Sequence, residues 1–237
     1  MWQWRGSDSS AVSNTDGTIT STISANTDAG FSVVTFTTPA SGTFTFGHGL
    51  GVAPAMVIVK RRSTTSSWGI WHKGLSGGTY YVLLDTTGAQ VNSSTVFTAV
   101  PTSTVVNMGT AWATSATMVA YCFAEVEGYS KFGSYTGNGS TDGPFVYTGF
   151  RPAYVLIKRV TTAGGSWVIH DSSRNTYNVA DLNLYANLSD AENSSAVLDF
   201  TSNGFKIRTT RLGENQSGAT FIYMAFAENP FKNSLAR

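Results

Sequence analysis

The sequence contains little charge, one cysteine and three histidines, and these shortages exclude several classes of protein. Charged residues are 12% of the 237 residues, and 15 lysines and arginines balance 14 aspartates and glutamates. A duplex nucleic-acid binder needs a basic surface to displace counterions, so the balanced charge argues against that class. The single cysteine, Cys122, excludes an internal disulfide framework and a cysteine-based zinc site.

Long hydrophobic stretches are also missing. The longest nearly apolar run, 116–124, has nine residues, whereas a membrane-spanning helix needs about 20. The first residues show no basic region followed by an apolar stretch, so we expect no secretory signal. We therefore expect no nucleic-acid partner and no insertion into a membrane.

Small and hydroxyl-bearing residues are abundant, and the hydrophobic pattern is that of β-strands. The chain has 28 serines, 32 threonines and 24 glycines. Apolar residues alternate with small or polar ones in four segments: 31–36, 42–46, 80–84 and 204–208. Residues 55–59 and 220–226 are almost continuously apolar, which is typical of strands buried on both faces. No stretch keeps a period of 3.6 residues, so the sequence predicts an all-β fold.

An internal repeat organises the chain. Residues 49–61 resemble residues 149–159, with Pro54 matching Pro152 at an offset of 98. The offset grows to 99 at the next matched segment, then to 101, and reaches 103 where residues 119–125 match 222–228. Offsets that drift slowly in one direction are typical of loop insertions in a duplicated domain. We predict two tandem antiparallel β-sandwich repeats, jelly-roll or lectin-like, of about 100 residues each.

The repeat predicts three segments. Residues 31–128 form the first sandwich repeat, and residues 129–237 form the second with a short C-terminal tail. Residues 1–30 contain Trp2-Gln3-Trp4, which resembles the closing strand of a preceding repeat, and then a linker rich in serine and threonine. We therefore expect the chain to be the C-terminal piece of a longer array.

Charged residues recur at matching strand ends. A Lys-Arg pair ends an apolar strand in each repeat, and a glutamate ends the last strand. If these ends meet, Lys60 pairs with Glu125 and Lys158 pairs with Glu228. A surface ion pair contributes only about 0–1 kcal/mol, so we interpret these pairs as markers of register.

Several long motifs resemble a known family. They are 13–31, 47–54, 121–128, 132–139 and 225–232. Together they are similar to a repeated C-terminal domain of uncharacterised function in structural proteins of tailed bacteriophages, many of them marine. That family is often described as lectin-like. The resemblance covers essentially the whole chain and implies a virion component, such as a tail fibre or spike, without implying any particular site residue.

Catalytic and metal-binding motifs are scarce. The glycine-rich segment 47–51 contains His48 but lacks the sixth-position glycine of a dinucleotide fingerprint, so we interpret it as a tight turn that needs positive φ. The carboxylates are scattered through loops, and no spacing selects a pair for glycoside hydrolysis. Residues 138–143 could supply a few calcium ligands, but a plain turn accounts for them better. We expect no enzyme activity, no cofactor and no metal.

Aromatic residues give the candidate binding site. Trp68 with Ile70, and the matching Trp167 with Ile169, are predicted to face the core. The opposite face would then carry a glycan surface, because sugars stack on aromatic rings while their hydroxyls bond short polar side chains. Its candidate residues are Trp71, Tyr80, Tyr81, His170, Asp171 and Tyr177. Ordinary decoration of an outer sheet face is the alternative interpretation.

These observations together predict a non-catalytic tail-fibre or spike segment that adheres to host-surface glycans. The family resemblance implies a position on the virion surface after assembly in the host cytoplasm. It also implies self-association, most simply as a homotrimer, and contact with other virion proteins. A capsid decoration or head-fibre protein with a purely structural role is the first alternative. A polysaccharide-degrading tailspike is the second.

Overall fold

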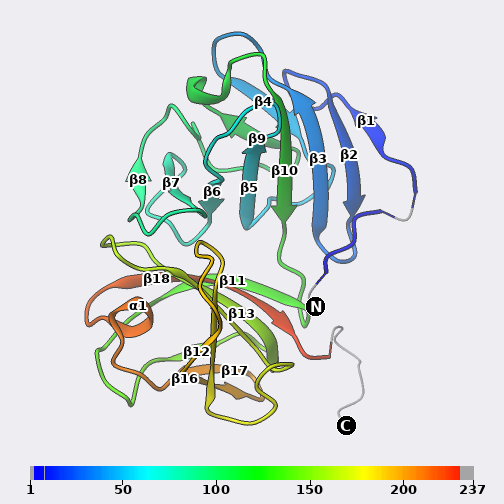
Figure 1. The fold of residues 1–237 in the computed structure, drawn as a ribbon. Helices are drawn as coiled ribbons and strands as arrows, with labels where there is room; N and C mark the ends of the chain where they lie inside the picture. The colour runs from blue at the N-terminus through cyan, green and yellow to red at the C-terminus, as the bar shows by residue number, and fades with distance from the viewer. Residues whose placement is uncertain (1–2, 8, 230–237) are drawn as a thin grey trace. The chain divides into compact units, whose positions relative to one another are not determined.

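A computed structural model describes residues 3–7 and 9–229 (Figure 1). Its regular structure consists of β-strands, apart from a 3₁₀ turn at Thr110–Trp112 (η1) and a short α-helix at Leu212–Asn215 (α1). All pairings between the named strands are antiparallel. The all-β antiparallel prediction is therefore confirmed. Trp2 and the tail from Pro230 lie outside the described residues.

The chain divides into two compact units. The first consists of the residues up to Leu83 together with Val91–Glu125. The second consists of Leu84–Gln90 and the residues from Val126 onward. Among the residues that the structure describes, no helix has the length and hydropathy needed to cross a bilayer.

The first unit is built on an eight-stranded sheet in the order β1-β2-β3-β10-β5-β6-β7-β8, with a separate β4-β9 pair. Its strands are β1 (Val12–Asn14), β2 (Ser21–Asn26), β3 (Phe31–Thr37), β4 (Phe44–Gly47), β5 (Met56–Arg61), β6 (Gly69–His72), β7 (Tyr80–Leu83), β8 (Val91–Asn92), β9 (Val105–Met108) and β10 (Thr117–Phe123). The predicted linker 1–30 thus contributes two strands, since β1 pairs with β2 and β2 with β3.

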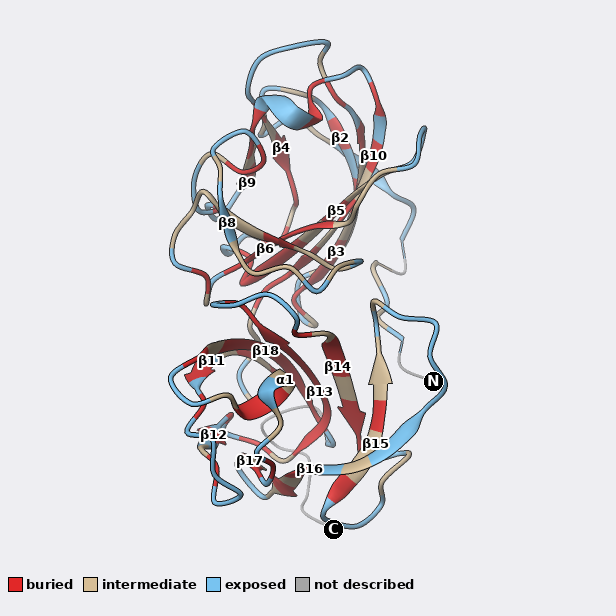
Figure 2. Ribbon diagram, turned by 60° about the vertical axis from the view of Figure 1, so that its left-hand side comes forward, coloured by how far each residue is buried: buried red, intermediate tan, exposed pale blue. Residues whose placement is uncertain are grey.

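The second unit is a single eight-stranded sheet in the order β11-β18-β13-β14-β15-β16-β17-β12. Its strands are β11 (Ser130–Thr136), β12 (Phe145–Tyr147), β13 (Pro152–Arg159), β14 (Trp167–Asp171), β15 (Ala180–Tyr185), β16 (Asn193–Thr201), β17 (Gly204–Ile207) and β18 (Thr220–Ala227). Figure 2 shows red along β13, which is buried over its whole length.

The two units share one strand order. β3-β10-β5-β6-β7-β8 in the first corresponds to β11-β18-β13-β14-β15-β16 in the second, and the β4-β9 pair corresponds to β12-β17. The register agrees as well, because Val57 lies opposite Cys122 in the first unit and Val155 lies opposite Ala225 in the second. These pairs are separated by the same offsets, 98 and 103, that relate the sequence segments.

Each unit has its own hydrophobic core. In the first, Val34, Val57 and Met118 of the large sheet cluster with Phe46 of β4 and Val106 of β9. The corresponding cluster of the second unit joins strands β13 and β18 to strands β12, β16 and β17. The alternation of apolar residues along these strands therefore drives the large sheet to pack against the shorter strands.

The predicted ion pairs Lys60–Glu125 and Lys158–Glu228 do not form. Lys60 lies opposite Val119, six residues before Glu125, and its Nζ donates to the carbonyl oxygen of Ser66. Glu125 pairs with Lys73 at 2.6 Å, and Glu228 pairs with Arg151 at 2.9 Å. The register prediction was wrong because each lysine lies at the far end of its strand from the glutamate.

Candidate functional site

Three of the predicted glycan-surface residues are buried, namely Trp71, His170 and Asp171. Trp71 is 5% exposed and His170 is 0% exposed. Trp71 belongs to the core cluster and lies opposite Val57, so it occupies the face that was predicted for Trp68 and Ile70. The assignment of faces was therefore wrong. All four residues of β6 are buried, and a strand covered on both faces gives no alternation from which the core face could be read.

The predicted faces are also reversed at the matching position of the second unit. His170 lies opposite the core residue Val155, while Trp167 lies on the other face, opposite Lys158. Trp167 is also buried, at 2% exposed. Burial, together with the smaller effects of the nearby Arg174 and Arg211, lowers the pKa of His170 to about 3. The imidazole is therefore neutral and closed to ligands.

The remaining predicted residues differ in their exposure and in their surroundings. Asp171 is buried and accepts a hydrogen bond from Arg174 at 2.6 Å, so it stabilises the turn that follows β14. Tyr177 is 85% exposed. Tyr80 and Tyr81 are half-buried neighbours on β7, and Tyr81 lines a pocket with Arg61. Three of the six residues belong to the first unit and three to the second.

The segment around His48 is a turn, as predicted. Gly49 and Gly51 have φ values of 70° and 72°, in the left-handed region that favours glycine. The His48 ring is buried and accepts a hydrogen bond from the Leu50 N–H at 3.2 Å. Burial lowers the pKa of this imidazole. Within the described ranges, no three His, Cys, Asp or Glu side chains gather where they could hold a metal ion.

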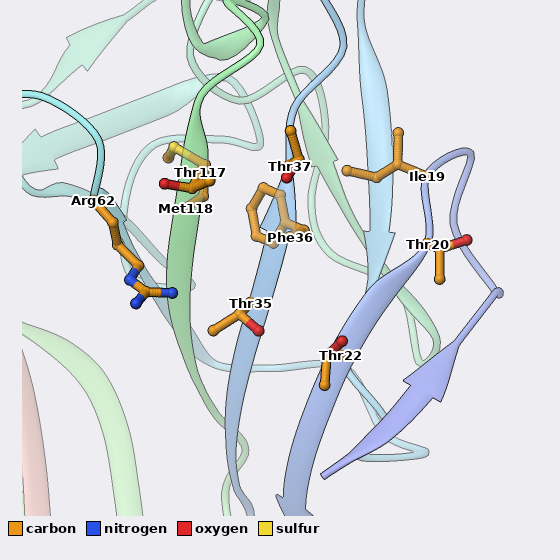
Figure 3. A pocket seen from close by; sticks show the side chains of 9 residues that line it. All are labelled: Ile19, Thr20, Thr22, Thr35, Phe36, Thr37, Arg62, Thr117 and Met118. Carbon is orange, nitrogen blue, oxygen red and sulfur yellow. The ribbon is translucent and has the colours of Figure 1, made fainter.

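A shallow threonine-lined depression is the candidate site that the sequence did not indicate. It lies on the outer side of strands β2, β3 and β10 and has a volume of about 390 Å³ (Figure 3). Ile19, Phe36 and Met118 complete its lining alongside its polar side chains. These polar side chains are Thr20, Thr22, Thr35, Thr37, Thr117 and Arg62. We call this surface the threonine depression.

Strand pairing sets the spacing of these threonines. Thr22 lies opposite Thr35, and Thr37 lies opposite Thr117. Paired strands are about 4.8 Å apart, and side chains two residues apart on one strand are separated by roughly 6.7 Å. Arg62 is positioned at the edge of this grid because its backbone N–H donates to the Thr117 carbonyl at 2.8 Å. The result is a regular two-dimensional array of hydroxyl groups.

The polar groups of the threonine depression are available to a ligand. Thr35 is half-buried, and the other four threonines and Arg62 are exposed. Across residues 3–7 and 9–229, none of the five hydroxyls bonds another protein group, and the Arg62 guanidinium has no ion pair. A hydroxyl can both donate and accept, and Arg62 adds up to five donors. The depression can therefore bind a ligand that carries many oxygen atoms.

The sequence contained only a weak signal for this depression. Threonines recur with a period of two at Thr20 and Thr22, and at Thr35 and Thr37. Threonine is frequent throughout the chain, however, so these pairs do not stand out. The depression also depends on β3 pairing with both β2 and β10, which brings together residues almost 100 positions apart.

The fold and this surface define an all-β protein with a hydroxyl-lined sheet face. Residues 1–230 match a family model described as a domain of unknown function, DUF7483, and the chain belongs to that family. No curated protein and no solved structure matches the chain.

Proposed function

We propose that this chain is a non-catalytic structural module of a bacteriophage particle that binds host-surface glycans. The threonine depression carries the glycan-binding part of the proposal. The phage part rests on the motif resemblance at residues 47–54, 121–128 and 132–139. The module would form a segment of a tail fibre or spike on the virion surface.

We also propose that the two units are tandem copies of one β-sandwich. Their shared strand order and matched register support this proposal. A matched lysine supports it further, because Lys60 donates to the carbonyl of Ser66 and Lys158 to the carbonyl of Gly165. Repeated units of this kind are suited to an elongated appendage, in which each module adds length without a new fold.

The chemistry of the threonine depression favours a polysaccharide. Sugar hydroxyls both donate and accept, as the threonine hydroxyls do. The threonine methyl groups and Ile19 supply apolar area for the CH faces of a sugar ring. A chain of several sugars can bond successive rows of the array, which compensates for the weakness of each contact.

A glycan array of bacterial surface polysaccharides tests this proposal. We expect binding by the full chain and a loss of about tenfold in the Thr22→Val, Thr35→Val double variant. Each neutral hydrogen bond contributes about 0.5–1.5 kcal/mol, and 1.4 kcal/mol is a factor of ten. Valine keeps the shape and strand preference of threonine, so the fold is retained.

The matched control is Thr43→Val, because Thr43 is an exposed threonine of the same unit outside the depression. It should bind as the unchanged chain does. Binding that is equal in all three proteins would contradict the role of the threonine depression. Release of reducing ends from a bound polysaccharide would favour the tailspike alternative, and binding to assembled capsids without any glycan signal would favour the decoration alternative.

We further propose that the chain self-associates, most simply as a homotrimer, and contacts other virion proteins. This part rests on the family resemblance. Light scattering coupled to size-exclusion chromatography tests it. A mass three times the chain mass of 25.2 kDa is expected, and a monomer at all concentrations would contradict it.

A further inference from the structure

A second pocket of the first unit is separate from the threonine depression. It has a volume of about 210 Å³ and is walled by the apolar side chains of Leu83, Val96 and Ala111. Its polar side chains are Arg61, Ser66, Ser67, Tyr81 and Trp112. We call it the Arg61 pocket. None of its lining residues lines the threonine depression.

Arg61 has few partners inside the protein. Its guanidinium lies over the Trp112 ring, with Cζ 5.7 Å from the ring centroid, and Nη2 donates to the Ala111 carbonyl at 3.2 Å. Among the described residues, its buried Nε has no hydrogen-bond acceptor, and neither has the indole Nε1 of Trp112. Trp112 is 7% exposed. Buried donors without acceptors are costly, so this chain alone does not satisfy Arg61 and Trp112.

In the second unit, the arginine that matches Arg61 has hydrogen-bond acceptors from its own chain. Arg159 matches Arg61 in register, since Arg61 lies opposite Met118 and Arg159 lies opposite Phe221. Nη1 of Arg159 donates to the Leu212 carbonyl at 2.8 Å and also to the Gln216 side chain.

The other nitrogens of Arg159 are used as well. Its Nε donates to the Thr162 carbonyl at 3.3 Å, and Nη2 donates to the Ala163 carbonyl. Arg159 is 5% exposed, and all three of its guanidinium nitrogens have acceptors. The second unit thus satisfies this arginine with its own chain, whereas in the first unit Arg61 donates one hydrogen bond, to Ala111, and lines a pocket.

We propose that the Arg61 pocket binds a single sugar acid, such as a uronic acid residue, through its carboxylate. Carboxylates match the planar donor fork of arginine and form charge-assisted hydrogen bonds. The Tyr81, Ser66 and Ser67 hydroxyls suit the ring hydroxyls of a sugar, while Leu83 and Val96 contact its CH groups. A volume below the about 300–1,000 Å³ of ordinary ligand pockets limits the ligand to one ring.

Titration with glucuronic acid, followed by NMR, tests this proposal on the full chain. We expect the Trp112 indole N–H resonance to shift on addition of glucuronic acid. Glucose lacks the carboxylate and acetate lacks the ring, so each should bind at least tenfold more weakly. Equal binding of glucose and glucuronic acid would overturn the carboxylate assignment, and equal binding of acetate would overturn the sugar assignment.

Variants separate this pocket from the threonine depression. Arg61→Gln should weaken glucuronic acid binding at least tenfold. Ala111→Leu should do the same by filling the pocket, and because Ala111 is exposed this variant keeps the fold. Thr43→Val is the control, because Thr43 is exposed in the same unit and lines neither pocket, and it should leave glucuronic acid binding unchanged.

The two proposals therefore fail in different ways. No shift of the Trp112 signal at millimolar glucuronic acid, or unchanged binding in Ala111→Leu, would overturn the Arg61 pocket. Neither result bears on polysaccharide binding by the threonine depression, which the Thr22→Val, Thr35→Val variant tests.

Discussion

Glu214 provides a sharp quantitative test of the second unit. The residue is 0% exposed, and within the described residues neither carboxyl oxygen has a hydrogen-bond partner. Arg211 lies 3.6 Å from one oxygen, which is an ion-pair distance without a hydrogen bond. Burial raises the pKa of Glu214 from 4.5 to about 7, and the opposing effects of Arg211 and Arg159 are smaller.

The sign of the pH dependence follows from this shift. The folded second unit holds the Glu214 proton more tightly than the unfolded chain, so the stabilisation is complete below pH 4.5 and is lost as the pH rises through 7. One pKa unit corresponds to about 1.4 kcal/mol, so the difference between 4.5 and about 7 gives a loss of about 3 kcal/mol. Glu214→Gln keeps the shape of the side chain and cannot titrate.

The assay is urea unfolding at pH 5 and pH 8, followed by the NMR signals of the second unit. Relative to the unchanged chain, Glu214→Gln should gain about 2–3 kcal/mol of unfolding free energy between the two pH values. Asp190→Asn is the matched control, because it removes an exposed carboxylate of the same unit. Parallel pH profiles for Glu214→Gln and the unchanged chain would refute the reasoning.

Two further predictions concern other buried or strained positions. The neutral His170 stabilises the folded state above pH 6.5, and this stability is lost as the pH falls towards about 3. His170→Leu should therefore make the urea unfolding free energy of the second unit less sensitive to acid. An unfolding free energy that falls with acid as steeply as in the unchanged chain would contradict the burial of His170. Gly49→Ala should lower the free energy of unfolding by about 1–3 kcal/mol through left-handed strain. It should cost more than Gly51→Ala, because an added Cβ at position 49 would lie 2.2 Å from Ile23 Cδ1 while none is crowded at position 51. Equal thermal stability of the two glycine variants would contradict that packing.

The sequence predicted the strands with strong patterns. Residues 31–36 and 220–226 lie in β3 and β18, and residues 55–59 overlap β5 from residue 56, because runs of β-branched and aromatic residues suit a pleated, buried surface. The turn at Gly49 was predicted correctly because a positive φ is a property of the local backbone, and glycine favours it.

The faces of buried strands could not be predicted. Gly69–His72 is buried on both sides, and its one polar residue, His72, is itself buried, so no exposed residue marks an outer face. Trp71 was therefore assigned to a surface although it belongs to the core. Local periodicity reports exposure only where one face meets water.

The two candidate sites were hidden for different reasons. The threonine depression depends on which strands become neighbours, and that pairing of distant segments is not encoded in a local pattern. The sequence did not indicate the Arg61 pocket, because both repeats have the same Lys-Arg pair at this position, Lys60-Arg61 and Lys158-Arg159. Only the surroundings show that Arg159 has acceptors from Leu212 and Gln216 while Arg61 lacks such a set.

Threonine-methyl NMR of the chain, titrated with a polysaccharide that it binds on the array, tests the central claim most directly. We predict that the methyl signals of the depression shift together while the polysaccharide stays intact, namely those of Thr20, Thr22, Thr35, Thr37 and Thr117. Shifts confined to threonines elsewhere in the chain, or cleavage of the polysaccharide during the titration, would contradict it.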